Sequence, residues 1–172
     1  MPSLGDAGLQ GREHPPAIGW RGDDFATNSN RVNDNLTPVA RSAAMRAVKG
    51  RDTKPEMQVR RMLHALGYRY RTHLAKLPGR PDLAFTRRKA AVFVHGCFWH
   101  GHDCPRGGRM PKANAGFWRV KIDRNRERDG RTAAALEVIG WRSAVIWECE
   151  LREPDRVAAT LQAFLGPPRS NG

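Results

Sequence analysis

The apolar positions of residues 53–66 recur at helical spacing, and Gly67 follows the last of them. Thr53 and Glu56 have the spacing of a capping box, in which each residue satisfies a backbone N–H of the other. Pro55 suits the first turn of a helix. This pattern predicts a helix that begins near Thr53 and ends near Gly67.

The rest of the chain contains further segments with regular patterns. Helices are predicted at residues 37–48, 115–138 and 154–165, the second of them weakened at Gly130. Strands are predicted at residues 68–74, 82–86, 90–95 and 141–147, with a basic turn at residues 87–89. Residues 90–94 are apolar on both faces, which is typical of a central, fully buried strand.

The predicted order of elements is α-α-β-β-β-α-β-α, which indicates a three-layer α/β domain with a mixed central sheet flanked by helices. Residues 1–36 are rich in Gly, Asn, Asp and Pro and show no periodicity, so we expect a disordered N-terminal tail. The folded domain is expected to span residues 37–168, and residues 169–172 are expected to form a disordered C-terminus.

The 172 residues include 30 Lys and Arg but only 17 Asp and Glu, which gives a net charge of +13. The predicted tail holds more acidic than basic residues, so the positive charge belongs to the predicted domain. A surface of this kind favours a polyanionic partner. No apolar run approaches the roughly 20 residues of a membrane span, and the first residues lack a secretory pattern. We therefore expect a cytoplasmic protein.

The densest group of chemically active side chains lies between His95 and Cys104, where three histidines and two cysteines occur. Zinc prefers four nitrogen or sulfur ligands, and Cys97, His102 and Cys104 can supply three of them from one loop. The only remaining cysteine, Cys149, is the candidate for the fourth. We expect a structural zinc site. The alternative is a set of buried free thiols with surface histidines.

Two histidines of this stretch, His95 and His100, are not needed as zinc ligands and are candidates for acid–base chemistry. Asp82 opens a predicted strand after Pro81, and Pro-Asp at such a place is a weak signal of a magnesium-dependent nuclease. The (D/E)-x-K triplet usual in nucleases does not follow. A metal on Asp82 would therefore need a backbone carbonyl, water or phosphate oxygens, and a histidine would deprotonate the attacking water.

Several motifs together make a specific resemblance over residues 42–151. They are Met45-Arg-Ala, Arg51-Asp-Thr, Leu77-Pro-Gly-Arg-Pro-Asp, His95-Gly-Cys-Phe-Trp-His, Phe117-Trp, Glu127-Arg-Asp, Gly140-Trp-Arg and Trp147-Glu-Cys. The chain resembles the very short patch repair (Vsr) mismatch endonucleases, a bacterial family. The resemblance implies a restriction-endonuclease-like fold.

The resemblance also implies roles for individual side chains. Asp82 matches the Mg²⁺-binding aspartate, and His100 matches the histidine that takes the proton of the attacking water. Asp129 matches the carboxylate that orients this histidine. His95 matches a histidine near the scissile phosphate, and Glu56 matches an acidic residue at the edge of the active site.

The remaining correspondences concern metals. Val94 stands where the family often has threonine; if its backbone carbonyl binds Mg²⁺, the change is neutral, but if the hydroxyl matters, activity is in doubt. The family's structural zinc ligands match Cys97, His102, Cys104 and Cys149.

Aromatic side chains of the family wedge into the duplex beside the mismatch, where flat rings can offset the cost of opening a base step. By resemblance these wedges are Phe98, Trp99 and Trp118, and Met45 is a further candidate on the predicted first helix. The two tryptophans of residues 141–147 are instead expected in the core.

By resemblance the protein is a Mg²⁺-dependent endonuclease that recognises T·G mismatches from deaminated 5-methylcytosine and nicks 5′ of the thymine. Expected partners are mismatched DNA, functionally a DNA cytosine methyltransferase, and mismatch-repair proteins. The chain is expected to be monomeric and associated with the bacterial nucleoid. Two alternatives are an inactive zinc-stabilised mismatch-binding module and a restriction-type nuclease for matched DNA. The presence of Asp82, His100 and Asp129 disfavours the first, and the wedge aromatics disfavour the second.

Overall fold

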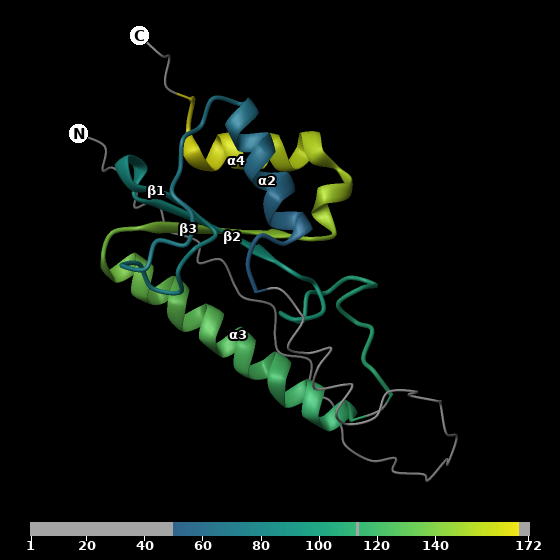
Figure 1. The fold of residues 1–172 in the computed structure, drawn as a ribbon. Helices are drawn as coiled ribbons and strands as arrows, with labels where there is room; N and C mark the ends of the chain where they lie inside the picture. Colours follow the sequence, from purple (N-terminus) through teal and green to yellow (C-terminus); the bar gives the residue numbers. More distant parts are fainter. Residues whose placement is uncertain (1–49, 113, 169–172) are drawn as a thin grey trace, which may run out of the picture. The chain divides into compact units, whose positions relative to one another are not determined.

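A three-stranded mixed sheet lies at the centre of the computed structural model, which describes residues 50–112 and 114–168 (Figure 1). The short strand β1 (Leu83–Phe85) pairs antiparallel with β2 (Ala90–His95). Strand β3 (Arg142–Trp147) pairs parallel with β2, in register along its whole length. The central position of β2 confirms what its apolar sequence predicted, since its first three residues are fully buried.

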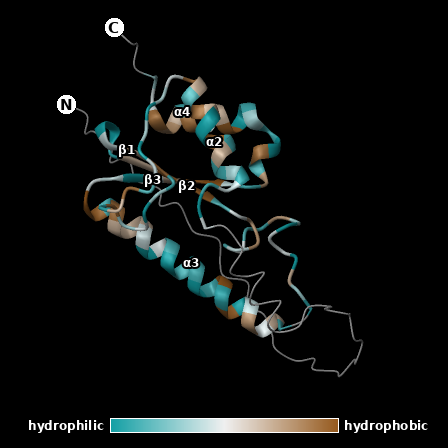
Figure 2. Cartoon of the chain, in the orientation of Figure 1, coloured by the Kyte–Doolittle hydropathy of each residue, from teal (hydrophilic) through white to brown (hydrophobic). Residues whose placement is uncertain are grey.

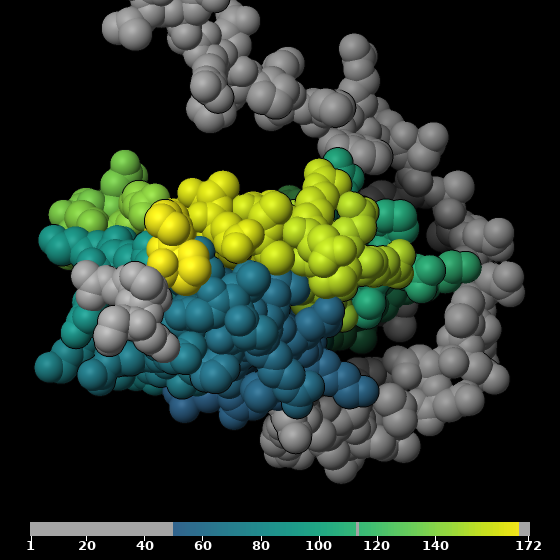
Figure 3. Space-filling view, turned by 90° about the horizontal axis from the view of Figure 1, so that it is seen from above, coloured from purple at the N-terminus to yellow at the C-terminus, as the bar shows by residue number. Residues whose placement is uncertain are grey.

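Helices cover both faces of this sheet. Helices α2 (Lys54–Ala65) and α4 (Pro154–Leu165) lie side by side on one face, as Figure 3 shows from above. Helix α3 (Ala115–Val138) crosses the other face and connects β2 to β3 (Figure 1). This confirms a mixed α/β architecture of helices around a mixed sheet.

The two faces of the sheet have cores of different size. Apolar side chains of α2, α4 and the sheet form the larger one, which includes the fully buried Leu63 and Leu161. On the other face, Leu136 of α3 packs against Leu77, Ala84 and Ala91. Figure 2 shows that α3 is hydrophilic along much of its length. Most of this helix therefore faces solvent, and its polar side chains are available for a site.

The predicted capping box forms in part at the start of α2, where Glu56 bonds the Thr53 hydroxyl and the Asp52 N–H in place of the Thr53 N–H. The Glu56 backbone N–H donates to Thr53 Oγ1 at 3.4 Å, and the Glu56 carboxylate accepts hydrogen bonds from Thr53 Oγ1 at 3.0 Å and from the Asp52 backbone N–H at 2.9 Å. The first of these bonds satisfies one of the backbone N–H groups that a helix start leaves unpaired. The other two hold the Glu56 carboxylate in one orientation.

Most predicted elements have nearly the observed bounds. The elements β2, α3 and α4 match their predictions, and α3 continues through Gly130 without interruption. Of the basic turn, Arg87 and Arg88 belong to a short 3-10 helix, η1 (Thr86–Arg88). A second, η2 (Glu150–Arg152), precedes α4. No described helix is long and apolar enough to cross a membrane.

The strand predicted at residues 68–74 is wrong. Only Arg71 pairs there, through an isolated bridge to Ala84. His73 has a φ of +47°, in the left-handed region, and this ends any extended run. The helix predicted at residues 37–48, which carries Met45, and both predicted disordered ends lie outside the described residues.

The turn that leads into Asp82 depends on Gly79, whose φ is +69°. A Cβ at this position would lie 2.3 Å from Thr132 Cγ2 on α3. Gly79→Ala is therefore expected to lower the free energy of unfolding by about 1–3 kcal/mol, from backbone strain and overpacking together. Urea denaturation would measure this change.

The matched control is Gly130→Ala in the middle of α3, where an added Cβ would have no neighbour within 4 Å. That substitution is expected to raise the free energy of unfolding by about 0.5–1 kcal/mol, because glycine is a poor helix former. An equal effect of the two substitutions would contradict the assigned role of Gly79.

Candidate active site

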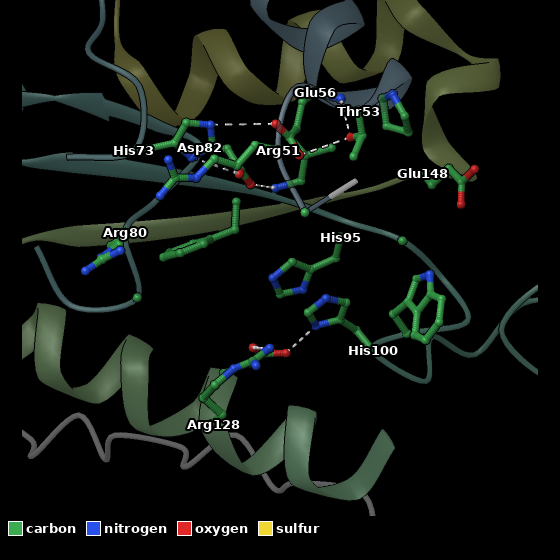
Figure 4. Close-up of a pocket in the computed structure, with 18 of the residues that line it drawn as sticks. Arg51, Thr53, Glu56, His73, Arg80, Asp82, His95, His100, Arg128 and Glu148 are labelled. Carbon is green, nitrogen blue, oxygen red and sulfur yellow. Dashed lines mark hydrogen bonds and ion pairs between the residues drawn. The ribbon is translucent and has the colours of Figure 1, made fainter. Parts of the chain in front are cut away.

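One cleft of about 900 Å³ opens at the end of β2 where the chain leaves the sheet. Its walls come from the start of α2, the segment before β1, the loop after β2 and the middle of α3 (Figure 4). Seven residues with sequence-predicted roles line it, namely Glu56, Asp82, Val94, His95, Trp99, His100 and Asp129. The structure thus brings together side chains that lie far apart in the sequence.

Asp82 is held against the central strand. Its Oδ2 accepts a hydrogen bond of 2.7 Å from the Val94 backbone N–H. Burial raises the pKa of Asp82, the Val94 hydrogen bond opposes this shift, and the nearby carboxylate of Glu56 adds to it. Burial and the nearby negative charge of Glu56 both disfavour the ionised form of Asp82. A cation bound here would offset that cost, so Asp82 is a favourable metal ligand.

His100 and Asp129 form a pair on the opposite wall. The distance from His100 Nδ1 to Asp129 Oδ2 is 2.5 Å, and Asp129 comes from α3. Since a carboxylate only accepts, the imidazole donates from Nδ1. Its other nitrogen, Nε2, is then the one that can take a proton.

His95 stacks on His100, with the two ring centroids 3.7 Å apart and an interplanar angle of 11°. Burial and, to a lesser extent, the nearby His100 lower the pKa of His95 to about 4. His95 is therefore neutral at physiological pH, and two adjacent rings can stack without charge repulsion.

The four predicted zinc ligands also come together. The ligand atoms of Cys97, His102, Cys104 and Cys149 all lie within 4.8 Å of one another. Two nearby thiols differ in acidity: the Gly107 backbone N–H lowers the pKa of Cys104 to about 6, whereas burial raises that of Cys97 to about 12. The cluster is compatible with zinc, since a cation among sulfur and nitrogen donors favours thiolates.

Trp147 links this cluster to the histidine pair. Its ring stacks on His102 with centroids 4.2 Å apart, and its edge faces His95 at 5.4 Å. The sequence analysis placed both tryptophans of residues 141–147 in the core. Trp141 packs against the smaller core, whereas Trp147 is half-buried at the end of β3 and contacts both His102 and the His95–His100 pair.

Phe98, Trp99 and Trp118 lie in mutual edge-to-face contact, with ring centroids 5.2–5.9 Å apart. The Lys121 ammonium lies 5.2 Å from the Trp99 ring centroid. Phe117, for which no role was predicted, contacts Trp118 and is 61% exposed. The sequence signal that could have identified Phe117 is its position next to Trp118, a predicted wedge.

Sequence reasoning also missed several polar residues of the cleft. They are Arg51, His73, Arg80, Lys121, Arg128 and Glu148. Arg51, Arg80, Arg128 and Glu148 stand inside the motifs that carry the family resemblance, but no role was predicted for them. The net charge of +13 does not say which of the 30 basic residues face one cleft. His73 carried no signal, since its partners come from distant segments.

A partly buried carboxylate, a histidine–carboxylate pair and several cations around one cleft are the parts used in hydrolysis of phosphate esters. The comparisons with known proteins agree with this class. The family profile described as DNA mismatch endonuclease Vsr matches residues 33–106.

Full-length relatives extend the match. The chain is 47% identical over 136 residues to the type II nicking enzyme V.XorIIP of Xanthomonas oryzae pv. oryzae, which covers 79% of this chain and 99% of the relative. It is 40% identical over 126 residues to the DNA mismatch endonuclease Vsr of Escherichia coli, and this match covers 73% of this chain and 78% of the relative. The chain therefore belongs to the Vsr family of DNA mismatch endonucleases, which are hydrolases of DNA.

Proposed function

We propose that this endonuclease depends on Mg²⁺, recognises T·G mismatches, and nicks the strand 5′ of the mismatched thymine. The observation that supports this most directly is that Asp82 and the His100–Asp129 pair face one cleft. A T·G pair results from deamination of 5-methylcytosine opposite guanine. We therefore also propose a functional association with a DNA cytosine methyltransferase.

Asp82 would hold Mg²⁺, together with the backbone carbonyl of Val94. These are the oxygen ligands that Mg²⁺ prefers, and phosphate and water oxygens can fill its other positions. When bound, Mg²⁺ supplies charge that stabilises the phosphoryl oxygens during hydrolysis. A backbone carbonyl does not depend on the side chain, so valine at position 94, where the family often has threonine, would leave this metal ligand intact.

His100 would act as the general base. Its Nδ1–H donates to Asp129, so Nε2 accepts the proton of the attacking water. Asp129 would orient the imidazole and stabilise its charge after the proton transfer. His95, neutral and stacked on His100, would lie beside the scissile phosphate.

DNA binding would combine charge and stacking. The cations of the cleft wall, such as Arg51, Arg80 and Arg128, would contact phosphates without reading sequence. Phe98, Trp99 and Trp118 would wedge beside the mismatch. A wobble pair stacks imperfectly and therefore opens at a lower cost than a matched pair.

Zn²⁺ bound by Cys97, His102, Cys104 and Cys149 would fix the loop that carries Phe98, Trp99 and His100. We further propose that residues 37–168 form one restriction-endonuclease-like domain, that the chain acts as a monomer in the bacterial cytoplasm at the nucleoid, and that mismatch-repair proteins are partners.

The direct test uses purified protein with Mg²⁺ and two duplexes that differ only in one base, T·G or C·G, in a methyltransferase site. We expect nicking 5′ of the thymine in the T·G duplex, little cleavage of the C·G duplex, and loss of activity with EDTA. Equal cleavage of both duplexes would indicate a restriction-type nuclease. Binding of the T·G duplex without nicking would indicate an inactive mismatch-binding module.

A further inference from the structure

His73 lies on the wall of the cleft between Arg60 and Asp82, and its side chain is 15% exposed. Its Nε2 is 2.9 Å from an Arg60 terminal nitrogen, and its Nδ1 is 4.0 Å from Asp82 Oδ1. Figure 4 shows the imidazole beside Asp82, with Glu56 on its other side. The imidazole therefore spans the space between α2 and the carboxylate that opens β1.

The contact with Arg60 fixes where the His73 proton resides. A guanidinium has only donors, so at 2.9 Å the imidazole Nε2 must accept. The neutral ring then carries its proton on Nδ1, the nitrogen that faces Asp82. The contact with Arg60 thus places the donor of His73 on the nitrogen that lies 4.0 Å from Asp82 Oδ1.

Arg60 is itself held firmly. One terminal nitrogen is 2.5 Å from Asp52 Oδ1, and the other is 3.2 Å from Glu56 Oε2. Arg60 and Glu56 are only 8% and 4% exposed. The hydrogen bonds from Thr53 and Asp52 fix the Glu56 carboxylate, and this carboxylate in turn accepts a hydrogen bond from Arg60 and orients it.

The backbone at His73 also has an uncommon conformation. Its φ of +47° lies in the left-handed region, which residues with a Cβ rarely adopt, and its N–H donates to the Pro81 carbonyl at 3.1 Å. Such conformations often occur at functional sites, where the surroundings hold them. Here the conformation anchors His73 to the residue just before Asp82.

We propose that His73 is a positioning residue for the metal-binding carboxylate: its Nδ1–H orients Asp82 Oδ1, while the Val94 N–H holds Oδ2. The proposal rests on the proposed function, in which Asp82 binds a divalent cation. The present separation of 4.0 Å exceeds hydrogen-bond length, and hydrogen bonds of active sites commonly shorten when the ligands are in place. Groups that orient a metal ligand typically change metal affinity by about 10- to 100-fold.

The test measures Mn²⁺ binding to the full chain by the electron paramagnetic resonance signal of the free ion. His73→Leu is expected to weaken binding by about tenfold or more. His73→Gln should remain within about threefold, because its amide can accept from Arg60 and donate to Asp82. His64→Leu is the matched control, since His64 is exposed on α2 and lies outside the cleft. Unchanged binding by His73→Leu, or equal loss in both His73 variants, would overturn the proposal.

Asp82→Asn distinguishes the role proposed for His73 from the proposed function on which it rests, in which Asp82 binds the metal. If Asp82→Asn still binds Mn²⁺ normally, the assignment of Asp82 as metal ligand fails. If Asp82→Asn loses binding and His73→Leu does not, only the role of His73 fails.

A second measurement needs no destabilising variant. In the ¹⁵N-labelled wild-type protein, imidazole nitrogen shifts report the tautomer, and the signal absent in His73→Gln identifies His73. We expect the proton on Nδ1 at neutral pH. A proton on Nε2 would overturn the proposal, because Arg60 could then not fix the donor that faces Asp82.

Discussion

Replacing His100 with alanine is expected to slow strand nicking by about 10²- to 10⁴-fold, the usual contribution of a general base. The reason is geometric: the Nδ1–H of His100 is bound by Asp129, which leaves Nε2 to accept a proton. Single-turnover rates with excess enzyme would measure the chemical step directly. DNA affinity should change far less than the rate.

Asp129→Asn tests the same pair from the other side. Asparagine can present its NH₂ to His100 Nδ1, which favours the wrong tautomer, so we also expect a large loss of rate. Asp123→Asn is the matched control, because Asp123 is exposed on the same helix and does not line the cleft. A native rate in His100→Ala would eliminate this residue as the base.

Cys149→Ser is expected to lose bound zinc and to unfold at a lower temperature. Loss of a metal site is among the few large effects of single substitutions. A loss of about 3 kcal/mol would lower the Tm by about 6–12 °C in a chain of this size. Metal analysis of the purified protein and thermal unfolding would measure the two effects.

Asp103→Asn is the control for the zinc prediction, since Asp103 is exposed between two of the ligands and is not one of the four. It should retain zinc and the native Tm. Trp147 provides an independent readout, because its ring stacks on His102 and its fluorescence should change when zinc is lost. Undiminished zinc in Cys149→Ser would disprove the four-ligand assignment.

The elements predicted well are those with strong local signals. Residues 90–94 are apolar without interruption, and residues 53–66 have the spacing of a capping box at one end and Gly67 at the other. Residues 68–74 alternate apolar and polar side chains like a strand, but their partner β1 has only three residues. The length of the partner strand does not depend on the residues at 68–74, so their alternating pattern could not show that the pairing would be so short.

The residues of the candidate site likewise fall into those with a local sequence signal and those without one. Asp82 was predicted because a Pro-Asp at a strand start is a local motif, and the candidate zinc ligands because three of them share one loop. His73 could not be found, because its role depends on Arg60 from one helix and Asp82 from the edge of the sheet. Its left-handed backbone also has no sequence signature for histidine.

The parallel pairing of β2 with β3 has a consequence for the order of folding. Cys97, His102 and Cys104 follow β2, whereas Cys149 follows β3, and the whole of α3 lies between the two sets. Three ligands are close in sequence and can meet early, but the fourth arrives only after the chain has completed its crossover. Full coordination of a metal would therefore mark the end of assembly of this half of the sheet.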